Sequence, residues 1–209
     1  MPNVKDILVA FLVAAALGFT PSIKAEPGVT QYRVTKASRS FDFVVRIRER
    51  LWEGIEEYRE GPGEVLVFRE GASKPFQTIV MKNISVSLDK SGHALINTAP
   101  LYDDQGMINV GHFNFDGYED FAVQNGNHGS YGSPSYAGYL YSPKKAQFLY
   151  SAPLSSLIRD TLGFFHVNSK SKHLVTFSKS GCCHHETVEY AVKDGVPVPL
   201  TRVVEGRQG

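Results

Sequence analysis

Apolar residues recur at every second position over much of the chain, a period typical of β-strands with one buried face. The runs 41–47, 64–69 and 84–88 show this alternation, and glycine, proline, asparagine or aspartate follow at short intervals. Evenly spaced strands separated by turn residues are characteristic of antiparallel sheets. The pattern therefore predicts an all-β fold: an antiparallel meander forming a sandwich or a propeller-like single domain, with at most one or two short helices.

Four pairs of expected strands enclose short turns and so predict β-hairpins. The turns lie at Gly71, at 142–145, at 168–172 and at Asp194-Gly195. The Asp-Gly pair is the strongest of these signals, because both residues tolerate the positive φ angles of a two-residue hairpin turn. In the last two hairpins we expect the core to contain Phe164, Val175, Phe177, Val188, Tyr190 and Val192.

Two segments show helical spacing instead. Over 48–60, apolar residues stand at positions 51, 55 and 58 on a charged background, which favours a helix; a twisted pair of strands is the alternative. The Gly-Pro-Gly sequence of 61–63 is expected to end whatever precedes it. Over 154–162, the apolar residues fall on one face and predict a short helix.

The first 25 residues have the pattern of an export signal. Lys5 precedes an apolar run at 7–19, and the small residue Ala25 ends the segment. The run is too short to span a bilayer comfortably, and a terminal small residue suits a cleavage site. Asp6 is atypical of the charged head, so an uncleaved anchor is the alternative. We expect residues 1–25 to be removed and 26–209 to form one all-β domain.

The charge of the chain is balanced. Its 209 residues include 22 Lys and Arg against 21 Asp and Glu, and removal of 1–25 leaves equal numbers of the two. A neutral balance gives no electrostatic basis for binding nucleic acid or an anionic membrane surface. We therefore expect neither as a partner of the mature chain, and a partner that is recognised by shape instead.

The segment 112–120 alternates polar groups and then turns at a glycine, as a tight calcium loop does. The oxygen ligands would come from Asn114, Asp116, the carbonyl of Tyr118 and Asp120. His112 stands at the first ligand position, where an Asp or Asn is expected, and imidazole nitrogen suits zinc or copper better than calcium. The loop therefore predicts either a weakened calcium site or a metal-free turn held by side-chain to backbone hydrogen bonds.

The segment 124–136 is too polar and too rich in glycine to be a strand, and expected strands flank it on both sides. One interpretation is a long connecting loop whose tyrosines pack back on the sheet. The other is a recognition loop in which Tyr131, between Ser130 and Gly132, inserts into a partner as an aromatic anchor.

The only two cysteines are adjacent, in Gly181-Cys182-Cys183-His184-His185. Neighbours on an extended chain point to opposite faces, so these four side chains do not meet at one zinc ion. A catalytic Cys-His pair would need an orienting third group, and none is recognisable. In an oxidising compartment the remaining outcomes are a strained vicinal disulfide between Cys182 and Cys183, which we expect, or two buried thiols.

Three stretches carry a resemblance to a known family: EVLVFREGASKPFQTIVM, then GHFNFDGYEDFAVQNGNHGSYGSPSYAGYLY, then TFSKSGCCHHETVEY. Over roughly 64–192 the chain resembles the exported FG-GAP-related proteins of Gram-negative bacteria. Those proteins are periplasmic immunity proteins against peptidoglycan-cleaving effectors of a type IV secretion system. In that family the loop at 112–120 usually opens with Asp, which His112 replaces here.

The resemblance implies a periplasmic, non-enzymatic protein that inhibits a lysozyme-like peptidoglycan hydrolase. It also favours the recognition-loop interpretation of 124–136. The inhibitory residues would be His128, Ser130, Tyr131, Gly132, Ser133 and Tyr136. Tyrosine, serine and backbone donors suit a cleft that carries two carboxylates. The alternative function is a calcium-dependent carbohydrate-binding or adhesion module of FG-GAP type.

Overall fold

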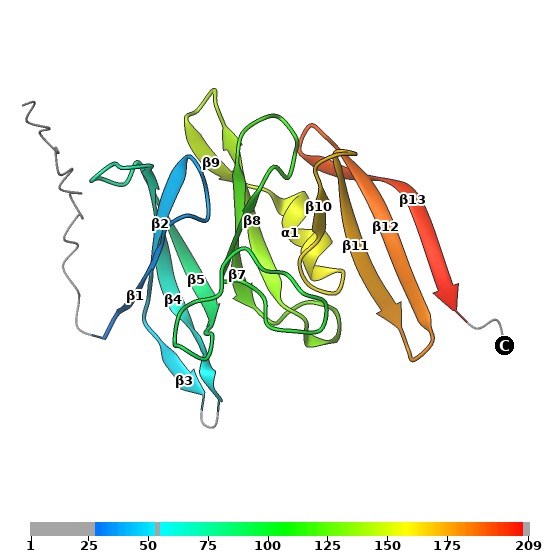
Figure 1. Cartoon of the computed structure of the whole chain (residues 1–209), viewed down its shortest axis with the longest axis horizontal. Coiled ribbons are helices and arrows are strands. Elements are labelled where there is room, and N and C mark those ends of the chain that lie inside the picture. Colours follow the sequence, from blue (N-terminus) through cyan, green and yellow to red (C-terminus); the bar gives the residue numbers. More distant parts are fainter. Residues whose placement is uncertain (1–27, 53–54, 207–209) are drawn as a thin grey trace, which may run out of the picture.

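Three antiparallel sheets follow one another along the chain and pack face to face (Figure 1). The computed structural model describes residues 28–52 and 55–206, and all structural statements refer to these. The expected export signal, 1–25, lies outside them. The fold is all-β with one short helix, as the sequence predicts, and no described helix is long and apolar enough to cross a membrane.

The first sheet has five strands, in the order β1-β2-β4-β3 with β5 paired to β4. Its strands are β1 (Thr30–Val34), β2 (Phe41–Ile47), β3 (Arg50–Trp52), β4 (Ile55–Arg69) and β5 (Gln77–Ser87). The middle sheet comprises β6 (Ile108–Gly111), β7 (Asp120–Gly126), β8 (Ser135–Ser142) and β9 (Gln147–Tyr150). The last comprises β10 (His166–Asn168), β11 (His173–Ser180), β12 (His184–Lys193) and β13 (Val196–Gly206). The four expected hairpins are all present: β4 with β5, β8 with β9, β10 with β11 and β12 with β13.

The predicted helix over 48–60 is wrong, because this segment forms β3 and the start of β4. Tyr58 pairs with Ser87 of β5, and its hydroxyl lies 3.0 Å from the hydroxyl of Ser85, so sheet contacts override the helical spacing. The glycines of 61–63 do not end the strand either. A Cβ on Gly61 would lie 2.0 Å from the carbonyl oxygen of Arg48. Glycine therefore lets β4 continue past the backbone at Arg48, with only a shift in its register with β5.

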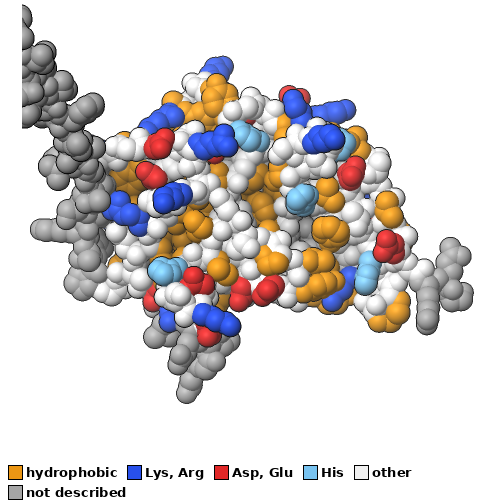
Figure 2. Space-filling view, in the orientation of Figure 1, with side chains coloured by type: hydrophobic (Ala, Val, Ile, Leu, Met, Phe, Trp, Pro, Cys, Tyr) orange, Lys and Arg blue, Asp and Glu red, His pale blue; other side chains and the backbone are white. Residues whose placement is uncertain are grey.

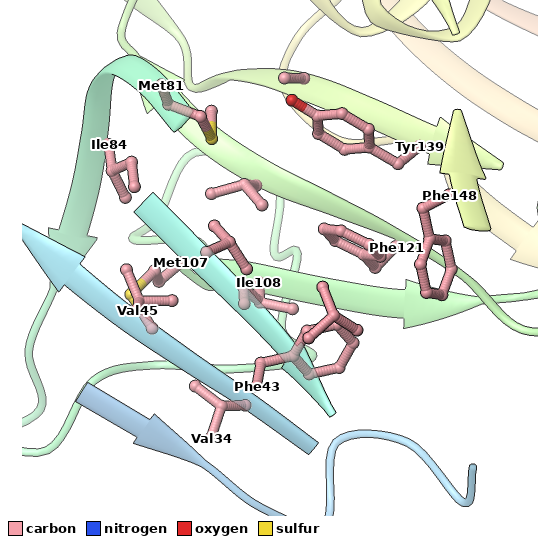
Figure 3. Packing of buried hydrophobic residues seen from close by; sticks show 14 of the residues in the cluster. Val34, Phe43, Val45, Met81, Ile84, Met107, Ile108, Phe121, Tyr139 and Phe148 are labelled. Atoms are coloured by element: carbon pink, nitrogen blue, oxygen red, sulfur yellow. The ribbon is translucent and has the colours of Figure 1, made fainter. Parts of the chain in front are cut away.

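An aromatic core joins the first and middle sheets (Figure 3). Phe121 of β7 lies at its centre, with ring centroids 5.0 Å from Phe43, 5.1 Å from Tyr139 and 4.7 Å from Phe148. Edge-on and offset ring pairs of this kind add to the stabilisation that burial alone supplies. The first two sheets are therefore held together by side chains from strands far apart in the sequence.

A second core covers the other face of the middle sheet, where α1 (Ala152–Arg159) and the last sheet pack. The helix confirms the prediction over 154–162. Gly138 of β8 faces it, and a Cβ there would lie 3.4 Å from the Cβ of Leu154; the Gly138 N–H donates to the Ser155 hydroxyl at 2.9 Å. The middle sheet is thus buried on both faces, which explains the nearly continuous burial of β7 and β8.

The last sheet has only one covered face. Phe164 and Val188 are buried as expected, and Val175, Tyr190 and Val192 are partly buried. Phe177 contradicts the prediction, since 39% of its surface is exposed. Its neighbour Thr176 is 2% exposed and takes the inward direction on β11, so the alternation of the strand turns Phe177 outward.

Candidate recognition surface

The segment between β7 and β8 is tied to the end of α1 by its serines. The Ser133 hydroxyl accepts a hydrogen bond from the Gly163 N–H at 3.1 Å and lies 3.2 Å from the Thr161 carbonyl oxygen. The Ser130 hydroxyl lies 3.3 Å from the carbonyl oxygen of Asp160. Two short polar side chains therefore anchor the segment to the body of the protein.

Tyr131 stands at the tip of this segment, in a 3-10 turn at Ser130–Gly132, and 64% of its surface is exposed. Its φ angle is 57°, in the left-handed region that side chains other than glycine rarely adopt. Its hydroxyl accepts a hydrogen bond from the Gly181 N–H at 3.0 Å, across 50 positions of sequence. Such a backbone conformation persists because its surroundings hold it, and the ring is thereby presented to solvent.

Gly181 belongs to the turn between β11 and β12, which also contains the adjacent cysteines. Cys182 and Cys183 are joined by a disulfide. The two sequence features that stood apart, the glycine-rich segment and the Cys-Cys-His-His run, therefore meet in the folded protein at Tyr131. His184 and His185 are exposed, and no group of three or more potential metal ligands is found among the described residues.

Tyr131 borders a hollow of about 440 Å³, and Tyr102 and Lys179 line it as well. The Lys179 Nζ lies 4.7 Å from the Tyr131 ring centroid and 5.1 Å from that of Tyr102. Leu101 and Phe177 are also exposed and line a second hollow of about 430 Å³. We call Leu101, Tyr102, Tyr131, Phe177 and Lys179 the recognition surface; Figure 2 shows hydrophobic side chains gathered on this face between the middle sheet and β11.

The remaining residues of the predicted inhibitory loop lie in different environments. His128 is exposed, and its N–H donates to the Ser135 hydroxyl at 3.3 Å. Gly132 is exposed beside Tyr131 and has a φ angle of 72°, which glycine adopts without strain. Tyr136 is 1% exposed, and its hydroxyl donates to the Gly106 carbonyl oxygen at 2.7 Å. Tyr136 therefore offers no surface to a partner and instead holds β8 in the core.

The calcium-type loop is closed by hydrogen bonds among its own members. The Asn114 side chain donates to the Asp116 carboxylate at 2.9 Å, and that carboxylate accepts from the Tyr118 N–H at 2.9 Å. The His112 Nδ1 lies 2.7 Å from the Tyr118 carbonyl oxygen, which is the expected backbone ligand. An imidazole that donates there occupies the direction from which a cation would be bound.

Asp120, the expected closing ligand, points into the protein and is 1% exposed. Its carboxylate accepts from the Phe113 N–H at 2.8 Å and from the Tyr141 N–H at 2.9 Å. Burial raises the pKa of this carboxyl to about 7, against the opposing effect of these donors. Because the expected ligand atoms already form hydrogen bonds within the protein, the arrangement does not fit a calcium ion.

Sequence reasoning named only Tyr131 of the recognition surface; it missed Leu101, Tyr102 and Lys179, and it placed Phe177 in the core. Tyr102 lies in the segment before β6, which reads only as a loop, and Lys179 lies near the end of a regular strand. Neither position carries a local signal. Their proximity to Tyr131 depends on how the last sheet packs against the middle one.

Among solved structures, the chain is similar to that of a Xanthomonas type IV secretion system related protein. The TM-score is 0.67 and the sequence identity 23%, over 90% of this chain and 86% of that chain. No family model and no curated protein matches the sequence. The similarity shows that the two chains share a fold over most of their length.

Proposed function

We propose that the mature chain is a periplasmic protein that inhibits a lysozyme-like peptidoglycan hydrolase, as the immunity partner of a secreted antibacterial effector. The observation that carries the proposal is Tyr131, which is largely exposed yet held in place by Gly181 and by the serines on either side of it. A rigid aromatic side chain that projects from a fixed loop is the usual anchor of a tight protein interface.

The physical advantage of this arrangement is preorganisation. A flexible tyrosine would lose side-chain and loop entropy on entering a cleft, which costs about 0.5–1.5 kcal/mol for each immobilised side chain. Tyr131 has already lost much of that freedom in the free protein, because its backbone is pinned and its hydroxyl is bonded. Ordering of this side chain on binding therefore costs less free energy than ordering of a flexible tyrosine would.

Two further observations support the proposal. The similar solved structure is that of a type IV secretion system related protein, and the sequence resemblance names immunity proteins against effectors of such a system. An inhibitor acts by occupying the hydrolase cleft, so it requires no catalytic group of its own. Because peptidoglycan hydrolases act in the periplasm, the proposal includes a periplasmic location for this protein.

Inhibition assays test the proposal. Purified mature protein is mixed with hen egg-white lysozyme and with any hydrolase encoded beside its gene, and the clearing of a cell-wall suspension is followed. We expect slower clearing with at least one hydrolase. Tyr131→Ala should weaken the complex by about 2 kcal/mol or more, as loss of a central aromatic anchor does. A panel in which the wild type neither binds nor inhibits any hydrolase overturns the proposal.

Tyr118→Ala is the matched control. Tyr118 is also an exposed tyrosine, with 45% of its surface accessible, but it belongs to the calcium-type loop and lies outside the recognition surface. It should bind the hydrolase as the wild type does. If both tyrosine variants lose binding equally, the effect is not specific to Tyr131, and the anchor assignment is wrong.

A further inference from the structure

Lys179 occupies an unusual position for a lysine, because its side chain is partly buried between two exposed aromatic rings. It lies near the end of β11, one residue before Ser180 ends the strand. Its ammonium group is within about 6 Å of both the Tyr131 and Tyr102 ring centroids, at 4.7 and 5.1 Å, the range in which a cation is attracted to a ring face. The two rings therefore fix the position of the charge.

Within the part of the chain that the structure describes, Lys179 forms no ion pair with a carboxylate at 4.0 Å or less. Asp103 and Asp104 line the same hollow, but neither forms an ion pair with Lys179 within 4.0 Å. The Asp103 carboxylate instead accepts the N–H of Asp104 at 2.8 Å. The ammonium thus lines the hollow beside Tyr131, held by two aromatic rings and by no ion pair of its own.

We infer that Lys179 is the cation that pairs with an active-site carboxylate of the bound hydrolase, an inference that rests on the proposed function. Glycoside-cleaving hydrolases carry two carboxyl groups beside the scissile bond. A cleft that accepts the Tyr131 ring also receives the ammonium 4.7 Å from that ring's centre. The ion pair would form between the Lys179 ammonium, whose position the two rings fix, and a carboxylate whose position catalysis fixes in the hydrolase. Such preorganised charges favour a net gain in affinity.

The inference separates the roles of two neighbouring side chains. Tyr131 supplies apolar contact and shape, whereas Lys179 selects clefts that contain a free carboxylate. A hydrolase without an acidic group at this place would bury an unpaired ammonium, which is unfavourable. Lys179 is therefore a specificity-determining residue of the recognition surface.

A variant series on both partners tests this, with whichever hydrolase the inhibition assays show to be bound. Lys179→Met keeps the apolar stem and removes the charge, and we expect its dissociation constant to rise about 30-fold or more, as for loss of one member of a buried charge pair. Lys179→Arg keeps the charge and the attraction to the rings and should retain most of the affinity. Lys170→Met removes an exposed lysine in the turn that precedes β11 and should bind as the wild type does.

The decisive comparison uses the hydrolase with its catalytic glutamate replaced by glutamine. If the pair exists, Lys179→Met and the wild type should bind this hydrolase with nearly equal affinity. A 30-fold difference that persists with the altered hydrolase overturns the inference, as does equal binding of Lys179→Met and wild type to the unaltered one. In both cases the wild type still binds, so the proposed function stands; if the wild type binds nothing, it is the proposed function that fails.

Thermal melting separates this role from a structural one. Lys179→Met should melt close to the wild type, because its charge makes no ion pair within the described residues. A loss of affinity that tracks a large loss of melting temperature, and that Lys179→Arg does not rescue, would assign Lys179 to folding and overturn the inference.

Discussion

Replacement of Asp120 by asparagine should strongly destabilise the protein. The carboxylate accepts from the Phe113 N–H with one oxygen and from the Tyr141 N–H with the other. A carboxamide has only one acceptor oxygen, so its NH₂ group must face one of these donors. Each buried group left without a partner costs about 1–3 kcal/mol, and with two such groups we expect Asp120→Asn to lower the unfolding free energy by roughly 2–6 kcal/mol.

The same residue gives the protein a specific pH dependence. Burial raises the Asp120 pKa from 3.8 to about 7, so the folded state keeps a proton that the unfolded state has lost between these values. This contribution to stability is fully present below the unfolded pKa and is lost as the pH rises through the folded one. At about 1.4 kcal/mol per pKa unit, the loss between about pH 4 and pH 7 amounts to at most ~4 kcal/mol.

Chemical denaturation at a series of pH values measures both effects. The wild type should lose stability relative to Asp120→Asn as the pH rises from about 4 to 7, because asparagine does not titrate. Taking the difference between the two proteins cancels the other carboxylates, including Glu119, whose pKa is lowered by hydrogen bonds from Ser38, Arg39 and Ser40 although burial opposes them. A difference that stays constant over this range would refute the assignment of a raised pKa to Asp120.

Three further predictions follow from other parts of the fold. Calcium should leave the melting temperature unchanged in the wild type and in His112→Asp alike, because Asp120 stays buried and bonded to backbone N–H groups in both; a rise in melting temperature with calcium in either protein contradicts the fit argument. Gly138→Val should cost about 2 kcal/mol or more by overpacking against Leu154, measured by denaturant unfolding, and a neutral effect would mean that α1 adjusts freely. Replacement of Cys182 and Cys183 by serine, or their reduction, should weaken hydrolase binding measured by calorimetry while the far-ultraviolet circular dichroism spectrum stays unchanged; full binding without the disulfide would show that the turn needs no such support.

The sequence was sufficient for the fold class and for most of the strands, because their signals are local. An Asp-Gly turn or an alternating run indicates its structure from the local residues alone, and the hairpins are found where these patterns occur. The prediction of a helix over 48–60 was wrong because helical spacing and strand pairing compete. The partner strand that decides the outcome, β5, lies elsewhere in the chain. The prediction that Phe177 is buried was wrong because alternation along a strand defines two faces but does not indicate which of them is covered.

The candidate site was also predictable only where the signal is local. Tyr131 could be selected because it lies among glycines and serines where no strand period accounts for it. Tyr102 and Lys179 could not, since nothing near them in the sequence indicates that they approach Tyr131. Predicting them would have required the packing of the last sheet against the middle one, which depends on long-range contacts throughout the second core.

The hydrogen bond between Gly181 and Tyr131 links the tip of the exposed segment to a turn that leaves the ribosome 50 residues later. A chain truncated before β11, or cleaved by a protease between the middle and last sheets, would still contain Tyr131 but would lack the group that holds it. Competence to bind a partner through Tyr131 would then appear only once the last sheet has folded. A half-folded chain would therefore not engage its partner, and binding through Tyr131 would itself report that folding is complete.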